Sequence, residues 1–245
     1  MLLLPDKKDA IHKAWLYRVL EAIADDDYLP SVLYFKGGTC AAMLGWLDRF
    51  SVDLDFDYVG DKQGVPATRT VLNGIFSKLN MTVKDSSKNG IQYFLKYANE
   101  GRNTLRLDSS FPVLKANTYA PQRLLDIDRI LVCQTKETMV AHKLLALIGR
   151  FESTGHVAGR DMYDLHTFFL KGYEYNTSVI QEARGVSVKR FLSDLSDFIK
   201  REISQTVINE DLNMLLPPAE FAAIRGVLKR EVLTLLKDEI ARNDK

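Results

Sequence analysis

The sequence predicts an α+β protein in which an N-terminal mixed β-sheet with helices is followed by a C-terminal helical domain. Two observations lead to this prediction. Up to residue 134, short apolar runs with strand-like alternation are mixed with helical segments, whereas from Thr135 onward apolar residues recur at helical spacing. This change of pattern places the boundary between domains 1–134 and 135–245. With 46% hydrophobic and 27% charged residues, the chain can bury a substantial core.

Helices and strands are expected to alternate early in the first domain, before an antiparallel run of strands, with helices against one face of the sheet. The expected helices span 6–27, 39–47 and 67–79, and the expected strands span 31–35, 52–59, 81–85, 90–99, 103–113 and 126–134. The expected helices of the second domain span 135–152, 159–172, 187–204 and 217–243. Pro217 and Pro218 are expected to mark the entry to the last helix.

The charge balance excludes a strongly cationic protein that coats nucleic acid. The chain has 33 basic and 32 acidic residues, for a net charge of +1. Contact with nucleic acid would therefore need a local basic patch, and helix 187–204 offers candidates for one, although an ordinary solvated helix face is the favoured interpretation of these residues. These candidates are Lys189, Arg190, Lys200 and Arg201.

The cysteines and the hydropathy pattern predict a cytoplasmic protein without a membrane segment. Cys40 and Cys133 have neither the number nor the spacing of a disulfide framework or a metal site, so they are expected to be reduced core residues. The opening apolar run is too short for a signal peptide, and no run reaches the ~18 apolar residues of a membrane helix.

Three acids at alternate positions, Asp53, Asp55 and Asp57, occupy one face of the strand expected over 52–59. A calcium loop of the EF-hand kind is excluded, because its sixth and twelfth positions would be Tyr58 and Gly64 instead of Gly and Glu. A solvated acidic face and a two-metal site for phosphoryl transfer both remain open. The second is favoured because two carboxylates on one face can hold Mg²⁺ together with substrate phosphates.

Two neighbouring segments add to the metal-site interpretation. A turn from Lys36 through Gly37, Gly38 and Thr39 lies one helix upstream, and its backbone N–H groups can approach phosphate closely. Asp108 ends another expected strand, where it could supply a third carboxylate or simply be a turn residue.

These motifs together resemble the nucleotidyltransferase signature of the DNA-polymerase-β-like superfamily. More narrowly, "KGGT" and "RFSVDLDF" resemble the AbiEii/AbiGii toxin family, the toxin half of bacterial abortive-infection toxin–antitoxin pairs. Two later stretches strengthen the resemblance: "AHKLLALIGR", which carries Lys143, and "GRDMYDLH", which carries Asp161 and Asp164. The motifs span residues 34–170 in the order that the family has them.

The resemblance implies roles for individual residues. Asp53 and Asp55 would hold catalytic Mg²⁺ or Mn²⁺, with Asp108 as the third carboxylate. Gly37, Gly38, Thr39 and Ser51 would contact the nucleotide phosphates. Lys143 would stabilise the triphosphate, and Asp161 or Asp164 would position Lys143 or the acceptor, although Asp161 could equally serve as a helix N-terminal acid.

Other polar residues receive weaker interpretations. Lys36 and Arg49 could touch phosphate or be surface charges, and Asp57 is expected to be solvated or to support the metal-binding acids. No role is predicted for the four histidines, His12, His142, His156 and His166, because they have no ligand spacing to one another.

The resemblance implies a toxin that transfers an NMP group from an NTP to an acceptor hydroxyl, with the tRNA 3′ end as the expected acceptor and a cognate antitoxin as a partner. The same catalytic residues would suit a nucleotidyltransferase that modifies a protein or a small molecule. A non-enzymatic nucleotide-binding module is a further alternative.

Overall fold

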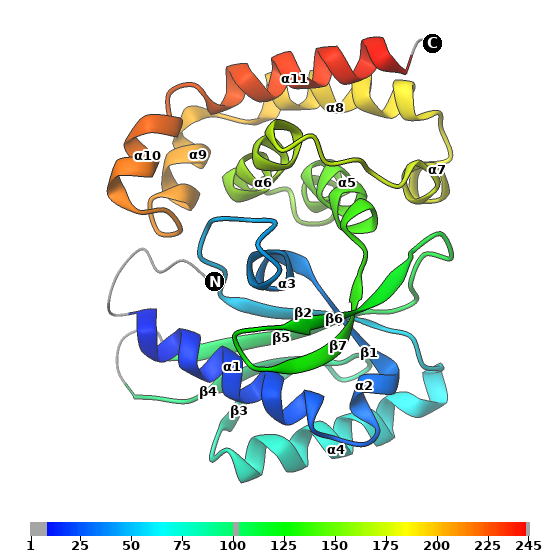
Figure 1. Cartoon of the computed structure of the whole chain (residues 1–245), viewed down its shortest axis with the longest axis vertical. Coiled ribbons are helices and arrows are strands. Elements are labelled where there is room, and N and C mark those ends of the chain that lie inside the picture. Colours follow the sequence, from blue (N-terminus) through cyan, green and yellow to red (C-terminus); the bar gives the residue numbers. More distant parts are fainter. Residues whose placement is uncertain (1–8, 100–102, 244–245) are drawn as a thin grey trace. The chain divides into compact units, whose positions relative to one another are not determined.

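The computed structural model describes residues 9–99 and 103–243, and it divides the chain into two compact units (Figure 1). The first unit extends to Val113 and also contains Thr118–Thr135, and the second consists of Leu114–Asn117 and the chain from Lys136 onward. The short segment 114–117 belongs with the helices because the Glu182 carboxylate accepts hydrogen bonds from the backbone N–H groups of Lys115 (2.9 Å) and Ala116 (2.7 Å).

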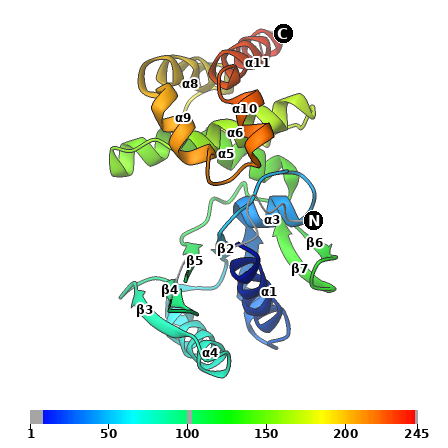
Figure 2. The same cartoon turned by 90° about the vertical axis from the view of Figure 1, so that its left-hand side faces the viewer.

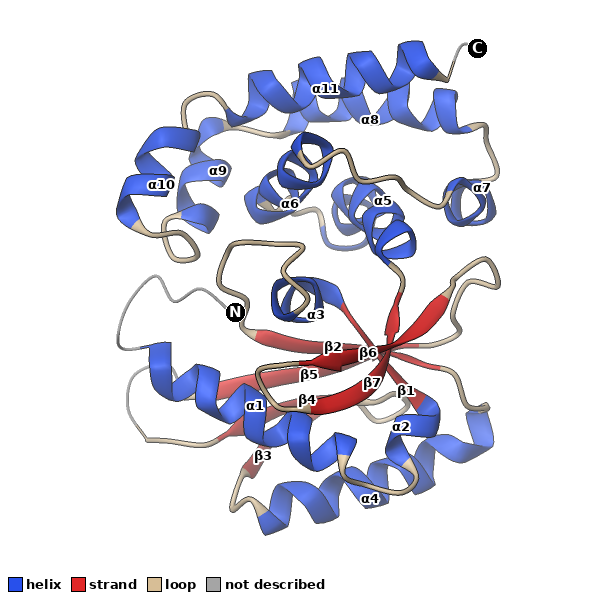
Figure 3. Cartoon of the chain, viewed as in Figure 1, coloured by secondary structure: helices blue, strands red, loops and turns tan. Residues whose placement is uncertain are grey.

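The first unit is built on a seven-stranded mixed sheet, which confirms the predicted sheet type (Figure 3). Its strand order is β3-β4-β5-β2-β1-β7-β6, with β2–β5 and β1–β7 parallel and the other pairs antiparallel. The strands are β1 (Leu33–Lys36), β2 (Asp53–Tyr58), β3 (Thr82–Ser86), β4 (Gln92–Lys96), β5 (Thr104–Ser110), β6 (Tyr119–Leu124) and β7 (Arg129–Gln134). The acidic strand β2 is therefore a central strand, between β1 and β5.

Helices pack on both sides of this sheet, which differs from the expected single covered face. Figures 1 and 2 show α1 (Ala10–Ala24) and α4 (Val65–Lys78) on one side and α3 (Gly37–Met43) on the other. Because Cys40, Ala41 and Ala42 are small and fully buried or nearly so, α3 can lie close to β1 and β2. Residues 6–8 of the predicted first helix lie outside the described residues.

Two local predictions in the first unit were wrong, and one strand was not predicted. Leu29–Val32 forms a short helix, α2, so the strand begins at Leu33 instead of Ser31. Gly37–Thr39 forms the first turn of α3 instead of a separate turn. Strand β6 was not predicted because it contains Pro121, which is tolerated there because β6 is an edge strand.

The second unit is helical, as predicted. Its helices are α5 (Lys136–Thr154), α6 (Gly159–Leu170), α7 (Thr177–Arg184), α8 (Val188–Glu202), α9 (Gln205–Leu212), α10 (Pro218–Ile224) and α11 (Leu228–Arg242). Their apolar faces form one buried cluster that includes Leu144, Leu165 and Leu195. The single helix predicted over 217–243 is two helices, separated at Arg225–Val227 around Gly226, and α7 and α9 were not predicted.

No helix within the described residues combines the length and the apolar character needed to cross a membrane.

Candidate functional site

Asp53 and Asp55 lie on one face of β2, as the alternation predicted. Leu54, Phe56 and Tyr58 are buried on the opposite face, whereas Asp53 and Asp55 are half-buried. Asp55 is on the α3 side of the sheet, because an added Cβ at Gly37 would lie 2.8 Å from the Asp55 Cβ. The strand therefore presents two carboxylates together where a glycine-containing helix begins.

The parallel strand β5 brings a third acid beside them. Asp108 is the register partner of Asp55, and Arg106 is the register partner of Asp53. The Asp108 carboxylate forms an ion pair with Arg106 and accepts a hydrogen bond from Gln92 Nε2 (3.3 Å) on β4. Asp108 is thus next to Asp55 as the sequence suggested, while Arg106 and Gln92 are partners that sequence reasoning missed.

The glycine pair is required by close packing on the acidic face. Gly37 has φ of +79°, and a Cβ there would collide with the Asp55 carboxylate. A Cβ at Gly38 would lie 2.8 Å from Ser51 Oγ and 3.1 Å from Arg49 Nη2. Only glycine at both positions lets the start of α3 lie so close to these side chains.

Thr39 and Ser51 connect this helix to the start of β2. The buried Thr39 hydroxyl donates a hydrogen bond to the Asp53 carbonyl oxygen (2.5 Å), and it lies 3.0 Å from Ser51 Oγ. Arg49 is also buried, and its Nη1 donates to the Phe50 carbonyl oxygen (2.9 Å). The interpretation of Arg49 as a surface charge was wrong, because its side chain is buried between the Phe50 carbonyl oxygen and Gly38.

Asp57 has a different environment from the other two acids, and of the two roles expected for it the solvated one was wrong. Its side chain is only 1% exposed and pairs with Lys36 Nζ (2.6 Å). Its other oxygen accepts hydrogen bonds from Tyr119 OH (2.8 Å) and Gln134 Nε2 (2.6 Å). Lys36 is 16% exposed and also donates to Ser110 Oγ (2.6 Å), so it is not a freely solvated surface charge. Asp57 is a buried structural acid whose partners come from β1, β6 and β7.

The acids fit a divalent ion through the chemistry of their donors. Carboxylate oxygens are the ligands that Mg²⁺ and Mn²⁺ prefer, and Mg²⁺ needs only one or two carboxylates when substrate phosphates complete its coordination. The missing Cβ at Gly37 lets the Asp55 carboxylate lie directly against the backbone at the start of α3. Among the described residues no group of three or more His, Cys, Asp or Glu side chains is arranged to hold a metal ion.

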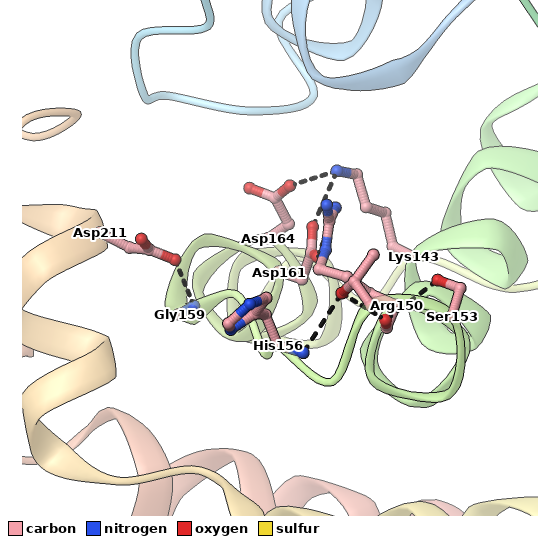
Figure 4. Close-up of polar contacts among 9 residues, drawn as sticks. Lys143, Arg150, Ser153, His156, Gly159, Asp161, Asp164 and Asp211 are labelled. Atoms are coloured by element: carbon pink, nitrogen blue, oxygen red, sulfur yellow. Dashed lines mark hydrogen bonds and ion pairs between the residues drawn. The ribbon is translucent and has the colours of Figure 1, made fainter.

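The second unit contains the other predicted residues in one charge cluster, which is drawn in Figure 4. The Lys143 Nζ lies 2.7 Å from Asp164 Oδ2 and 3.4 Å from Asp161 Oδ1. Arg150, which sequence reasoning did not single out, pairs with Asp161 Oδ2 through Nη2 (3.2 Å) and Nε (3.3 Å). Asp161 and Asp164 both bind Lys143 in this structure, so neither of them alone positions it.

Helix geometry explains the cluster. Lys143 and Arg150 are seven residues apart on α5, and Asp161 and Asp164 are three apart on α6, so each pair shares one helix face.

Helix α6 begins after Ala158, whose side chain cannot accept a hydrogen bond. Asp211 of α9 accepts one instead from the Gly159 N–H (2.6 Å). The partner lies about fifty residues away, and only the three-dimensional structure could reveal it.

Three histidine side chains contact residues that lie far away along the chain. His12 bonds Tyr97 OH (2.6 Å) and the Val52 carbonyl oxygen (2.8 Å), His142 bonds Asn117 Oδ1 (2.8 Å), and His166 lies 2.7 Å from a Glu231 oxygen. The fourth, His156, is exposed, and its backbone N–H donates to Thr154 Oγ1 (3.2 Å).

The basic candidates on α8 are largely neutralised by neighbouring acids. Arg190 pairs with Asp194, Lys200 with Asp197, and Arg201 with Glu202. These pairs favour an ordinary solvated helix face over a basic patch.

Comparisons with known proteins agree with this fold and with these motifs. A protein from H. pylori assigned as a nucleotidyltransferase is 21% identical, with a TM-score of 0.56, and the match covers 95% of this chain and 98% of that chain. The protein JHP933 from Helicobacter pylori is 20% identical, with a TM-score of 0.54 and coverage of 99% and 98%. These similarities show a shared fold. No match was found among curated protein sequences.

The family comparison covers most of the chain. The family described as "Nucleotidyl transferase AbiEii toxin, Type IV TA system" matches residues 18–232, which include all the motifs described above. The chain therefore belongs to the AbiEii family of nucleotidyltransferase toxins of type IV toxin–antitoxin systems.

Proposed function

We propose that the protein transfers an NMP group from an NTP to an acceptor hydroxyl and releases pyrophosphate. The observation that carries this proposal is the arrangement on β2 and β5. Asp53 and Asp55 share one strand face, Asp108 is the register partner of Asp55, and Gly37 lets the backbone at the start of α3 lie against the Asp55 carboxylate. Nucleotidyl transfer needs oxygen ligands for divalent ions and close access for a triphosphate, and this arrangement supports both.

The metal ions would be held by Asp53 and Asp55, with Asp108 as the third carboxylate. When bound, Mg²⁺ or Mn²⁺ would neutralise charge on the phosphate oxygens. Asp108 would serve in this role while it is also bound by Arg106 and Gln92, so these two side chains would orient its carboxylate.

The remaining predicted residues would contact the nucleotide. Gly37 and Gly38 would let phosphate oxygens approach the backbone, and Thr39 and Ser51 would support that approach with their hydroxyl groups. Lys143 would stabilise the triphosphate with its compact positive charge. Asp161 and Asp164 would hold its ammonium group in place.

The tRNA 3′ end is the proposed acceptor, because family membership points to a toxin, and modification at that end would stop translation. This reaction would take place in the cytoplasm, where tRNA is used. A cognate antitoxin is the partner that a type IV system implies. Protein or small-molecule acceptors, and nucleotide binding without transfer, are the competing functions that the experiment must separate.

Inducible expression of matched variants in bacteria tests the proposal. Wild type, Asp53→Ala and the control Asp85→Ala, which changes an exposed acid on β3, are expressed and tRNA 3′ ends are sequenced. The proposal predicts growth arrest and extended 3′ ends for wild type and for Asp85→Ala, and neither for Asp53→Ala. Arrest without extended tRNA would point to another acceptor, and equal arrest with Asp53→Ala would contradict an enzymatic mechanism.

A further inference from the structure

The charge cluster of α5 and α6 contains a second cation, Arg150, for which the proposed nucleotide contacts give no role. Arg150 lies two turns after Lys143 and reaches the same buried acid, Asp161 (Figure 4). We infer that Arg150 is a positioning residue that neutralises Asp161, so that Lys143 remains available to bind nucleotide phosphates. The effect on catalysis rests on the proposed function, whereas the effect on Lys143 itself does not.

The two aspartates are too deeply buried to remain charged without partners. The side chains of Asp161 and Asp164 are 1% and 0% exposed. A buried carboxylate needs an opposite charge and hydrogen bonds to stay ionised. Lys143 and Arg150 provide two positive charges for these two negative charges, and their side chains are 15% and 35% exposed.

The distances show that each of the two cations lies closest to a different aspartate. Lys143 Nζ is closest to Asp164 (2.7 Å) and farther from Asp161 (3.4 Å). Arg150 places two nitrogens on the other Asp161 oxygen, at 3.2 and 3.3 Å. A guanidinium suits this task because its planar fork can donate two hydrogen bonds to one carboxylate. Lys143 is thus paired mainly through Asp164 as long as Arg150 holds Asp161.

Without Arg150, the single ammonium of Lys143 would face two buried carboxylates. Both carboxylates would then draw on the same ammonium group and pull Lys143 inward, away from the triphosphate that it is proposed to bind.

Competitive acylation of Lys143, followed by peptide mass spectrometry, tests this inference without any nucleotide. The full-length variants are Arg150→Gln, Arg150→Lys and the control Arg184→Gln. The control removes the same charge from an ion pair with Glu152 elsewhere in the helical unit. Acylation requires access to the amine, which Lys143 would lose when both carboxylates draw it inward, so Arg150→Gln is expected to slow acylation of Lys143 several-fold. Arg150→Lys should restore most of the rate, and Arg184→Gln should leave it unchanged.

Faster acylation of Lys143 in Arg150→Gln would overturn the inference. If Arg150 only packs the two helices together, its loss would expose Lys143 and acylation would become faster. An unchanged rate in Arg150→Gln would also contradict the proposed neutralisation of Asp161.

Steady-state nucleotide transfer gives a second measurement. Loss of a charged hydrogen-bonding partner is expected to raise KM for the NTP roughly tenfold in Arg150→Gln, with a smaller change in kcat and partial recovery in Arg150→Lys. An equal loss of kcat in both variants, with KM unchanged, would contradict a role in nucleotide binding. Absence of transfer in the wild type would refute the proposed function, while the acylation result would still decide the role of Arg150.

Discussion

Asp55 on β2 lies directly opposite Asp108 on β5 in a parallel strand pair. The two carboxylates therefore belong to neighbouring strands at the same level of the sheet. Asp53 lies two residues before Asp55 on the same face. This relationship makes β2 and β5 together, instead of β2 alone, the framework of the proposed metal site.

Substitution of the acids should separate catalysis from stability. Asp53→Asn and Asp55→Asn are expected to lower the transfer rate roughly a hundredfold to a thousandfold, because each removes a proposed ligand for the catalytic ion. Asp108→Asn should lower it as well. Rates are measured with purified protein, and Tm is measured in parallel. A fall in Tm that accounts for the lost activity would contradict the proposed catalytic roles.

Substitution of Gly37, with Gly45 as the control position, tests whether α3 must lie close to Asp55. Both have a positive φ, +79° and +73°, so alanine should introduce backbone strain of about 1–2 kcal/mol at either position. An added Cβ collides with the Asp55 carboxylate only at Gly37, whereas nothing lies within 4 Å of it at Gly45. Gly37→Ala should therefore abolish transfer while Gly45→Ala retains it. Equal activity in the two variants would show that the close approach to Asp55 is unimportant.

Asp57 should matter for stability because its carboxylate is buried with three donors. Asp57→Asn is expected to lower the free energy of unfolding by about 3 kcal/mol, since it leaves Lys36 without its charged partner. The control is Asp128→Asn, whose ion pair with Arg123 is exposed and should contribute little. Urea unfolding measures both. A stable Asp57→Asn variant would contradict the structural role of this acid.

Glu182 should make the helical unit sensitive to acid. The backbone N–H groups of Lys115 and Ala116 lower the pKa of Glu182 from its ordinary value of 4.5. The unfolded chain therefore binds this proton more readily, so the stabilisation is present above pH 4.5 and is lost as pH falls through the lowered value. The Tm difference between wild type and Glu182→Gln should be largest near neutral pH and should shrink in acid. A difference that does not change with pH would contradict this linkage.

Cys40 and Cys133 should be unreactive in the native protein. Both are fully buried, and burial together with the neighbouring Cys133 raises the pKa of the Cys40 thiol. Iodoacetamide is expected to modify them only on unfolding, as monitored by mass spectrometry in increasing urea. Fast modification without denaturant would show that this part of the core opens readily.

The sequence was most informative where periodicity alone determines the outcome. The acidic face of β2 and helices α5, α6 and α8 were predicted because each follows the period of its own segment. Strand β6 could not be predicted from its own residues, because it contains Pro121. Proline is tolerated in an edge strand, and the order of the whole sheet decides which strand is at the edge.

Long-range partners could not be predicted in the same way. Asp57 has the same spacing as Asp53 and Asp55, yet Lys36, Tyr119 and Gln134 bury it. Nothing in a local pattern distinguishes the three acids, because the difference comes from other strands. Arg150 was overlooked for a related reason, since its partner Asp161 lies on the next helix.

Transfer of labelled phosphate tests the central claim most directly. The purified chain is incubated with tRNA, Mg²⁺ and each NTP carrying ³²P at the α- or the γ-phosphate, beside Asp53→Asn and Asp85→Asn. The account predicts that label from the α-phosphate enters tRNA with wild type and Asp85→Asn, that none enters with Asp53→Asn, and that label from the γ-phosphate is never transferred. Transfer of the α-phosphate by Asp53→Asn at the wild-type rate, or no transfer by wild type to any acceptor in a total cell extract, would contradict it.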